Sequence, residues 1–303
     1  MSLIKKNIVF TTSSFNSDII KKHKSKFKSI KVNNLGRKLT EKETISICKD
    51  AEIIIAGTEK YSKAVLKKLN KLKLIFRLGS GIDNIDTHFA KIKKIKVLKN
   101  SINPSSSVAE FILAFILSHL KKIFSSNENL NKGLWKKEKT FMLQEKIVGL
   151  VGLGQVGKKL AKLLKKFNVH VIYYDNSSKV KFSGLNKVTK NKLFKISDII
   201  VLCLPLNESS KNLIDYKLLK LLKYDSIIIN TSRGGIVNEK DLIKKLKSNP
   251  FFTYYTDVFS KEPYKGNHLN LKNIIKTPHI AGSANLIRTQ MENEALEKCS
   301  KEI

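Results

Sequence analysis

Three segments in the C-terminal half of the sequence each carry one reactive side chain directly after a predicted strand. They are NTSRGG with Arg233, DVFSKEP with Glu262 and TPHIAGS with His279. An arginine can bind a carboxylate through two parallel hydrogen bonds and polarise a neighbouring carbonyl. A histidine can give or take the proton of an alcohol, and a carboxylate beside it fixes its tautomer and raises its pKa. Together with a hydride carrier, these side chains could interconvert a 2-hydroxy acid and a 2-oxo acid.

Each of these three residues, taken alone, has a simpler structural interpretation. Arg233 could be a surface cap before two glycines, Glu262 a loop charge before a proline, and His279 a hydrogen-bonded histidine at a strand end. The catalytic interpretation therefore depends on the three occurring together and on a cofactor site elsewhere in the chain. The other histidines lack comparable neighbours and are interpreted as structural; they are His23, His88, His119, His170 and His268.

A glycine-rich loop earlier in the chain predicts where the hydride carrier would bind. In KIVGLVGLGQVG, Gly152, Gly154 and Gly157 match the pattern G-x-G-x-x-G between a strand pattern and a helix pattern. The first glycine permits the tight turn, the second lets a pyrophosphate approach the backbone, and the third lets helix and strand pack closely. The helix beginning near Gln155 would direct its free N–H groups toward the phosphates. Taken alone, the motif is equally compatible with a glycine-rich turn that serves only the packing of strand and helix.

An acidic residue strengthens the cofactor interpretation. Asp175 ends the next predicted strand, HVIYYD, eighteen residues after Gly157. A carboxylate at this place would accept hydrogen bonds from the adenosine ribose hydroxyls and repel a 2′-phosphate. Asp175 therefore favours NAD over NADP, although the nearby Lys179 leaves NADP open. The structural alternative is that Asp175 is only a turn or cap residue before Asn176.

Short apolar runs alternate with lysine-rich helical patterns along the whole chain. This alternation is typical of repeated βα units around a parallel sheet, so the predicted fold class is α/β. A chain of 303 residues is long enough for two such domains. The predicted strands are residues 6–10, 29–32, 52–57, 72–78 and 95–99, followed by 146–152, 170–175, 198–204, 226–230, 252–258 and 273–278.

A helical pattern after residue 100 marks the predicted domain boundary. NPSSSVAEFILAFILSHLKKIF begins with serines suited to helix capping and continues as one long amphipathic helix. A second helical pattern, residues 284–301, follows the last predicted strand. We therefore expect residues 1–98 plus 283–303 to form one domain and residues 99–282 to form an inserted dinucleotide-binding domain.

The net charge of +33 raises the possibility of a nucleic-acid-binding protein. However, only four of the 58 basic residues are arginine, the side chain suited to bidentate contacts with bases and phosphates. The lysines are spread over nearly every predicted helix, which favours solvated helix faces over a specific nucleic-acid site. A basic nucleic-acid-binding module remains an alternative, and incidental binding to polyanions is expected at low salt.

Cysteine usage and apolar runs exclude other classes of protein. The three cysteines are isolated, so the sequence predicts neither a disulfide framework nor a metal site. The longest apolar run, VAEFILAFILSHL, contains Glu110 and His119 and is shorter than the roughly 18 residues of a membrane span. The N-terminus has no signal-peptide pattern. A cytoplasmic protein that does not bind membranes is therefore expected.

Five motifs, in this order, resemble the D-isomer-specific 2-hydroxyacid dehydrogenase family, most nearly its phosphoglycerate dehydrogenase branch. They are LGSGIDNID, VGLGQVG, NTSRGGIVNEKDL, DVFSKEP and TPHIAGSA. The resemblance implies two Rossmann-like domains, a flavodoxin-like substrate domain and an NAD-binding domain, with the substrate in the cleft between them. It also implies a homodimer built through the region after residue 100, including VAEFILAFILSHL and LWKKEKTF.

The resemblance also implies roles for individual residues. Arg233 would bind the substrate carboxylate and carbonyl, His279 would be the acid-base catalyst, and Glu262 would be its partner. Backbone N–H groups of Ser80 and Gly81 would bind the substrate carboxylate. The NAD contacts implied by matching positions, besides the glycines, Asp175 and Ser80, are Gln155, Val156, Leu204, Thr231, Ser232 and Asp257.

Departures from the family pattern leave the substrate open. Ala56 stands where phosphoglycerate dehydrogenases often carry an arginine that helps to hold the phosphate, and Lys60 or Lys137 could substitute for it. Cys203 stands where many members have histidine, and a small apolar core residue is a sufficient explanation. KNSINP, residues 99–104, replaces a common Asn-x-Pro arrangement. Phosphoglycerate, glyoxylate, hydroxypyruvate and other small acids are therefore candidates, and an NAD-sensing corepressor is the alternative of another class.

Overall fold

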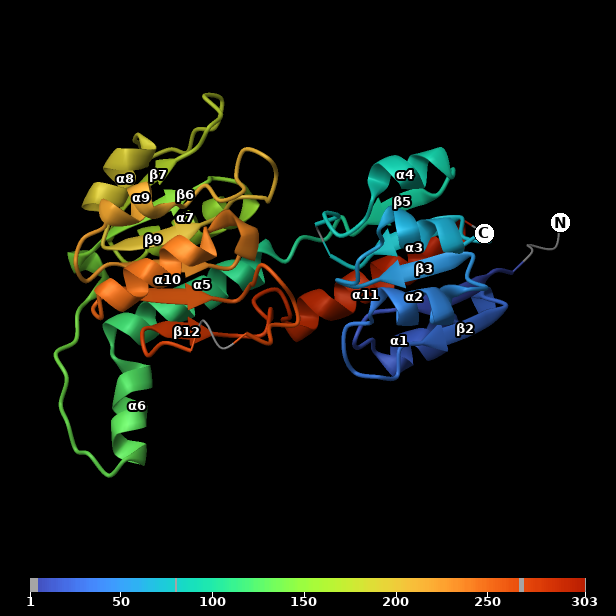
Figure 1. Cartoon of the computed structure of the whole chain (residues 1–303), viewed down its shortest axis with the longest axis horizontal. Helices are drawn as coiled ribbons and strands as arrows, with labels where there is room; N and C mark the ends of the chain where they lie inside the picture. Colours follow the sequence, from blue (N-terminus) through green and yellow to red (C-terminus); the bar gives the residue numbers. More distant parts are fainter. Residues whose placement is uncertain (1–4, 80, 267–269, 303) are drawn as a thin grey trace. The chain divides into compact units, whose positions relative to one another are not determined.

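The computed structural model describes residues 5–79, 81–266 and 270–302, which form two α/β units (Figure 1). Unit 1 comprises Met1–Pro104 and Ser283–Ile303, and unit 2 comprises Ser105–Gly282. The boundary between the first segment of unit 1 and unit 2 lies between Pro104 and Ser105, whereas the sequence predicted it between residues 98 and 99. The reason is that Asn100 and Ser101 are tied to unit 1, since the Asn100 side chain donates to the Met291 carbonyl over 2.8 Å.

Unit 1 is built around a five-stranded parallel sheet with the strand order β2-β1-β3-β4-β5. This order is typical of flavodoxin-like domains, whose ligands bind at the carboxyl ends of the strands. The strands are β1 (Asn7–Phe10), β2 (Ser29–Val32), β3 (Ile53–Ala56), β4 (Leu74–Arg77) and β5 (Lys96–Lys99).

Helices cover both faces of the unit 1 sheet. One core layer packs α2 (Glu41–Cys48), α3 (Lys63–Lys68) and α4 (Thr87–Ile92) against residues such as Ile54 and Ile75. The other layer joins α1 (Ser17–His23) and α11 (Asn285–Lys301) to residues such as Phe10 and Phe76. The last helix of the chain therefore packs on the sheet of the N-terminal segment, through Met291, Ala295, Leu296 and Cys299.

Unit 2 contains a seven-stranded parallel sheet with the order β12-β11-β10-β9-β6-β7-β8. The central strands are buried on both faces, which explains their uninterrupted apolar sequences. The strands are β6 (Ile147–Val151), β7 (His170–Tyr174), β8 (Asn186–Lys187), β9 (Ile199–Leu202), β10 (Ile227–Asn230), β11 (Thr253–Thr256) and β12 (Ile274–Lys276).

The helices of unit 2 pack in two layers. Core residues on one face join α5 (Ser105–Leu120) and α7 (Gln155–Lys165), and those on the other join α8 (Lys190–Ile196), α9 (Tyr216–Lys220) and α10 (Glu239–Ser248). Two parallel α/β sheets confirm the predicted fold class.

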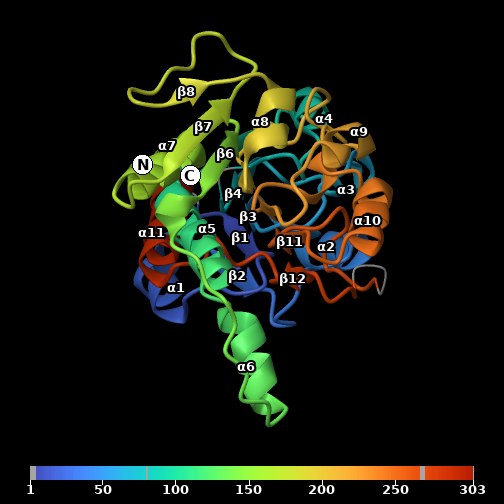
Figure 2. The ribbon, with the colours of Figure 1, turned by 90° about the vertical axis from the view of Figure 1, so that its left-hand side faces the viewer.

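The single long helix predicted after residue 100 is instead two helices. α5 ends at Leu120, and α6 (Ile123–Asn131) begins after Lys122, whose φ of 54° is left-handed. A residue with that conformation interrupts the regular helix. As a result, α6 and the segment after it project from unit 2 (Figures 1 and 2).

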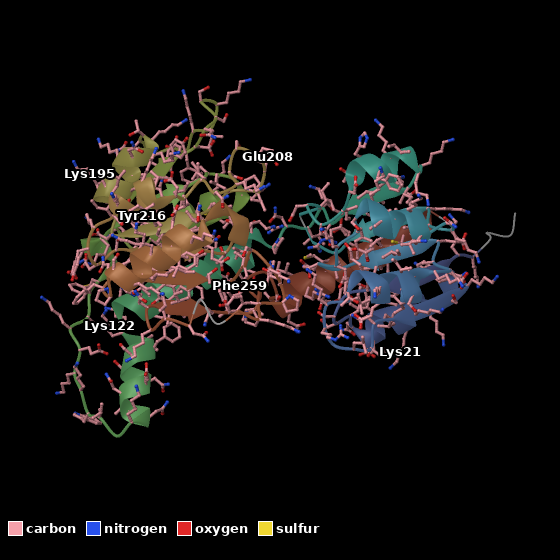
Figure 3. All side chains as sticks on the ribbon, in the orientation of Figure 1. Lys21, Lys122, Lys195, Glu208, Tyr216 and Phe259 are labelled. Carbon is pink, nitrogen blue, oxygen red and sulfur yellow. The ribbon has the colours of Figure 1, made fainter. Side chains whose placement is uncertain are left out.

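Charged side chains surround both units. Their tips point outward from helices and loops throughout each unit, and Lys21, Lys122 and Lys195 are examples (Figure 3). This distribution agrees with the interpretation of the lysines as solvated helix faces. In the described part of the chain, no helix is both long and apolar enough to cross a membrane.

Candidate functional site

The glycine-rich loop joins β6 to α7 in the conformation that its sequence predicts. Gly152 has a φ of +93°, and a Cβ placed there would lie 2.7 Å from the Cys203 carbonyl oxygen. A Cβ at Gly157 would lie 2.7 Å from the carbonyl oxygen of Gly152, so helix and loop approach closely. A Cβ at Gly154 would meet nothing within 4 Å. The first and third glycines therefore serve the turn and the packing, whereas the second leaves open space beside the backbone.

The start of α7 faces this open space. Gly154 is the N-cap, and Gln155 and Val156 form the first turn of the helix. The N-terminal backbone N–H groups of a helix carry partial positive charge and suit a phosphate. The loop and helix thus fit the pyrophosphate of a dinucleotide.

Asp175 lies directly beside the glycine loop at the end of β7. Its Oδ2 atom accepts a hydrogen bond from the Leu153 backbone over 2.9 Å, and its Oδ1 atom accepts one from the Ser177 backbone over 2.9 Å. The half-buried carboxylate therefore holds the glycine loop and also shapes the turn that follows β7. Each carboxylate oxygen can accept a further hydrogen bond, so these contacts leave capacity for ribose hydroxyls.

The segment after β9 closes another side of the glycine loop. The Cys203 backbone donates to the Val151 carbonyl over 2.8 Å, and the Leu204 side chain reaches the space beside Gly152. Burial raises the pKa of the Cys203 thiol to about 12, so the thiol stays neutral and behaves as a small apolar group. Leu204 thus borders the glycine loop, and its contact with a cofactor stays a prediction.

A buried asparagine organises the loop that carries Arg233. Asn230, at the end of β10, donates from its side chain to the Arg233 carbonyl over 3.0 Å and accepts from the Ser232 backbone over 3.0 Å. The Ser232 hydroxyl donates to the Leu202 carbonyl over 2.5 Å. Thr231, Ser232 and Arg233 are half-buried at the carboxyl edge of the sheet, where ligands of parallel α/β sheets bind.

His279 and Glu262 are in direct contact. The His279 Nδ1 atom lies 2.8 Å from Glu262 Oε2, and the other carboxylate oxygen, Oε1, accepts from the Phe259 backbone over 3.0 Å. Both side chains are half-buried. A carboxylate at Nδ1 fixes the ring orientation and directs proton transfer to Nε2. The pair is therefore arranged as a general acid-base group with its orienting partner.

Asp257 holds the loop that carries His279. Its buried carboxylate accepts hydrogen bonds from the Thr277 hydroxyl over 2.6 Å, the Ile280 backbone over 2.8 Å and the Ala281 backbone over 2.8 Å. His279 itself has a φ of 58°, a left-handed conformation that is uncommon for a non-glycine residue. The contacts of Asp257 on both sides of it stabilise this conformation.

Gly234 brings the arginine loop against the segment that leads to Glu262. A Cβ at Gly234 would lie 2.0 Å from the Phe259 carbonyl carbon and 2.2 Å from the Ser260 nitrogen, so the two backbones touch. The structure thus brings three predicted elements together in unit 2, namely the Arg233 loop, Glu262 and His279.

Other residues of the site differ from the sequence-based set. Gly81 lies in unit 1, after β4, and Ser80 lies outside the described residues. Asn230 and Thr277 were missed, although a polar residue that ends the buried run IIIN is a recognisable signal. No group of three or more metal-ligating side chains occurs among the residues that the structure describes.

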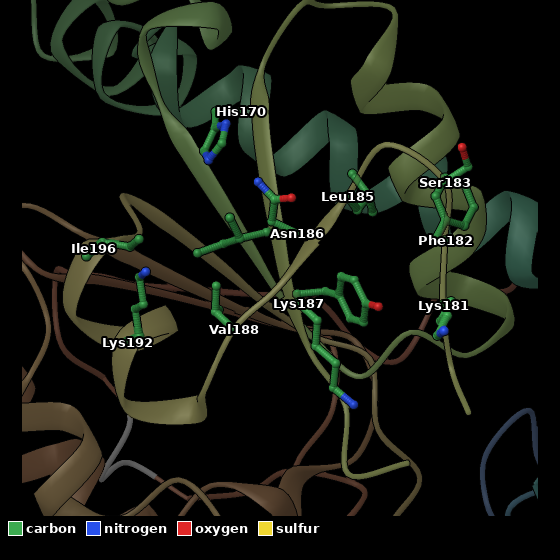
Figure 4. Close-up of a pocket in the computed structure, with 12 residues that line it drawn as sticks. His170, Lys181, Phe182, Ser183, Leu185, Asn186, Lys187, Val188, Lys192 and Ile196 are labelled. Carbon is green, nitrogen blue, oxygen red and sulfur yellow. The ribbon is translucent and has the colours of Figure 1, made fainter. Parts of the chain in front are cut away.

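A separate cavity of about 680 Å³ lies at the β8 edge of unit 2 (Figure 4). His170, Lys187 and Lys192 line it together with Phe182 and Leu185. None of the residues predicted for catalysis or cofactor binding lines this cavity. The cavity alone therefore gives no evidence of a ligand site.

Comparison with known proteins identifies the family. Residues 113–281 match the family model described as D-isomer specific 2-hydroxyacid dehydrogenase, NAD binding domain. A hydroxypyruvate reductase of Thermotoga maritima is 32% identical over 272 residues, which cover 88% of this chain and 89% of that protein. A D-3-phosphoglycerate dehydrogenase of Methanocaldococcus jannaschii is 35% identical over 254 residues, covering 81% of this chain and 48% of that protein.

A solved structure supports the same assignment. The NAD⁺-bound 3-phosphoglycerate dehydrogenase of Entamoeba histolytica superimposes with a TM-score of 0.79 and 26% identity, covering 98% of this chain and 94% of that one. This chain spans about half of the archaeal phosphoglycerate dehydrogenase but most of the hydroxypyruvate reductase. The chain belongs to the D-isomer specific 2-hydroxyacid dehydrogenase family.

Proposed function

We propose that the protein is an NAD-dependent oxidoreductase that interconverts a D-2-hydroxy acid and its 2-oxo acid. The contact of 2.8 Å between His279 and Glu262 carries this proposal, because it supplies an oriented proton donor and acceptor. The neighbouring Arg233 loop supplies a cation for the substrate carboxylate. The glycine loop of the same unit fits the cofactor, which supplies or accepts the hydride when bound.

The proton chemistry follows from these residues. In the reducing direction, Nε2 of His279 gives its proton to the carbonyl oxygen, which becomes the hydroxyl of the product. Glu262 stabilises the positive ring before transfer and keeps the Nδ1 proton in place afterwards. Arg233 holds the carboxylate and polarises the carbonyl, so that C2 becomes more electrophilic.

The substrate is proposed to be phosphoglycerate or a small 2-oxo acid such as glyoxylate or hydroxypyruvate. Buried Ala56 ends β3 at the position where phosphoglycerate dehydrogenases often carry an arginine, and the alternative cations Lys60 and Lys137 are exposed. These features favour the small uncharged substituents of glyoxylate and hydroxypyruvate over a phosphate.

Turnover of a panel of 2-oxo acids tests the proposal. We expect oxidation of NADH, followed by its absorbance, with at least one of glyoxylate, hydroxypyruvate and phosphohydroxypyruvate. Tight NADH binding without turnover of any acid would contradict the enzymatic proposal and favour the corepressor-like alternative.

Replacing Asp175 by asparagine is expected to weaken the preference for NADH over NADPH. Asparagine can still accept from the Leu153 backbone, but it lacks the negative charge that repels a 2′-phosphate. We expect the ratio of the Kd values for the two cofactors to shift by about tenfold, which corresponds to ~1.4 kcal/mol. Lys179→Gln on the same exposed turn is the control; an equal shift in that variant would contradict the role of Asp175.

We further propose that the projecting α6 segment forms a homodimer interface. Large apolar side chains are exposed along α6 and the residues after it, and Trp135 is 83% exposed. The others are Ile123, Phe124, Leu130, Leu134 and Met142. Clustered exposed apolar side chains are typical of protein interfaces.

Replacing Trp135 by lysine is therefore expected to convert a dimer into a monomer, as measured by light scattering after size-exclusion chromatography. Burial of an uncompensated charge would oppose association. Leu35→Lys is the control, because Leu35 is also exposed but lies in unit 1. A monomeric wild type, or a dimeric Trp135→Lys variant, would contradict this interface.

A further inference from the structure

A buried hydroxyl group in unit 2 lies behind the loop that carries Arg233. Tyr254 belongs to β11 and is 3% exposed, and its hydroxyl accepts a hydrogen bond from the Asn230 side chain over 3.1 Å. Burial raises the pKa of Tyr254 to about 12, whereas hydrogen bonds with Asn230 and Thr256 act in the opposite direction. A phenylalanine has nearly the same shape and would bury no polar atom at this place. The hydroxyl therefore requires an explanation beyond packing.

The contact with Tyr254 completes the hydrogen bonds of the Asn230 amide. Asn230 is fully buried. Its Nδ2 atom has two hydrogens, of which one donates to the Arg233 carbonyl over 3.0 Å and the other to the Tyr254 hydroxyl. Its Oδ1 atom accepts from the Ser232 backbone over 3.0 Å. Without the hydroxyl, a buried N–H group would lose its partner, and the amide would be held less firmly against the loop.

The Arg233 guanidinium contacts the same turn that Asn230 holds. Its Nη1 atom donates to the Ser232 carbonyl over 2.8 Å. In the chain, this carbonyl lies between the two groups that the Asn230 amide binds, the Ser232 N–H and the Arg233 carbonyl. A change in the orientation of the amide would therefore displace the carbonyl against which the guanidinium rests.

The strand that carries Tyr254 also leads to the acid-base pair. Tyr254 is paired in register with Ile228 of β10, and β11 is followed by Asp257, whose carboxylate holds the His279 loop. The Asp257 backbone in turn donates to the Asn230 carbonyl over 3.0 Å. The Arg233 loop and the His279 loop are thus both held by groups on or directly after β11.

We propose that Tyr254 is a positioning residue whose hydroxyl orients Arg233 through the Asn230 amide. This inference rests on the proposed function, in which Arg233 binds the substrate carboxylate and polarises the carbonyl. A guanidinium forms two parallel hydrogen bonds with a carboxylate only in a defined orientation. A group that is already oriented needs no rearrangement when the reaction occurs, so a loosened Arg233 would stabilise the transition state less well.

Tyr254→Phe in the full-length protein tests the inference, with Tyr255→Phe as the matched control. Tyr255 is also 3% exposed in β11, but its hydroxyl lies 3.1 Å from His119 Nδ1 on α5. Because each variant loses one buried hydroxyl, we expect similar shifts in the midpoint of chemical denaturation. In Tyr254→Phe we expect kcat/KM for the 2-oxo acid to fall about tenfold, less than the ~10²-fold that a displacement of 1 Å can cost. Tyr255→Phe should keep the wild-type kcat/KM.

Two further measurements separate a positioning role from a purely structural one. The inhibition constant of oxamate, a small analogue of a 2-oxo acid, should rise in Tyr254→Phe and not in Tyr255→Phe. In an Arg233→Gln background, Tyr254→Phe should cause no further loss of kcat/KM, because the residue through which it acts is already absent. Equal losses of kcat/KM in the two tyrosine variants, or the full loss from Tyr254→Phe in the Arg233→Gln background, would overturn the inference.

A second variant breaks the next hydrogen bond of the same chain if Tyr254→Phe does not fold. Asn230→Asp can still accept from the Ser232 backbone, but its carboxylate cannot donate to the Arg233 carbonyl. We expect the same decrease in kcat/KM and the same rise in the oxamate inhibition constant. A folded Tyr254→Phe or Asn230→Asp variant with wild-type values of both would overturn the inference. Absence of turnover by the wild type would instead refute the proposed function.

Discussion

Replacing His279 by glutamine is expected to lower kcat by about 10²- to 10⁴-fold, the range that a positioned general acid contributes. Glutamine can still hydrogen-bond to Glu262, but its amide cannot exchange a proton near neutral pH. The Kd for NADH should not change. Among the residues that the structure describes, no hydrogen bond joins the His279 side chain to the glycine loop or to Asp175. Steady-state kinetics and NADH fluorescence titration measure the two quantities.

Two further variants make this prediction specific. Glu262→Gln should also lower kcat, because it removes the charge that stabilises the imidazolium. His170→Gln is the matched control: His170 is exposed at the start of β7 and has no assigned role. Undiminished kcat in His279→Gln, or an equal decrease in His170→Gln, would contradict the acid-base role of His279.

The elements of the fold were predictable wherever the sequence has continuous apolar runs. IIIA of β3 and IIVL of β9 are buried on both faces of their sheets. A strand in that position needs an uninterrupted apolar sequence, and this run is visible in the sequence itself. β8 was missed because it contains only Asn186 and Lys187, both exposed, and it is a strand through its pairing with β7. The break before α6 was missed because Lys122 is an ordinary lysine in an apolar pattern. Its left-handed backbone is therefore set by the surrounding structure.

The same distinction applies to the candidate site. The three glycines and Asp175 lie within one βα unit, so local spacing was sufficient to relate them. The arrangement around Asp257 was not predictable, because its hydrogen-bond donors lie at least twenty residues later and reach it only through the pairing of β11 with β12. The contact between Gly234 and Phe259 likewise depends on two loops that leave neighbouring strands. The motifs thus pointed to the side chains proposed to react, whereas Asp257, named from the resemblance only as an NAD contact, holds the His279 loop through hydrogen bonds that no motif predicts.

The close approach of Gly234 to the backbone of Phe259 and Ser260 makes Gly234→Ala the second substitution with a large expected effect. Its Cβ would overlap the backbone at Phe259 and Ser260, and backbone atoms cannot move aside as a side-chain end can. We expect the free energy of unfolding to fall by about 1–3 kcal/mol, the usual cost of overpacking. We also expect kcat to fall by about 10²-fold, because separation of the loops displaces Arg233 and Glu262 by roughly 1 Å. Chemical denaturation and steady-state kinetics provide the two measurements.

Gly235→Ala is a matched control one residue later. Its Cβ would lie 3.3 Å from the nearest atom, the end of the Leu206 side chain, which can adjust by a small rotation. We therefore expect Gly235→Ala to retain nearly wild-type stability and kcat. The difference between these neighbouring variants isolates the backbone contact from a general effect of adding a methyl group to this loop. If both variants lose activity equally, the close approach at Gly234 does not control the geometry of Arg233 and Glu262. If Gly234→Ala loses stability but keeps kcat, the contact serves folding and not catalysis.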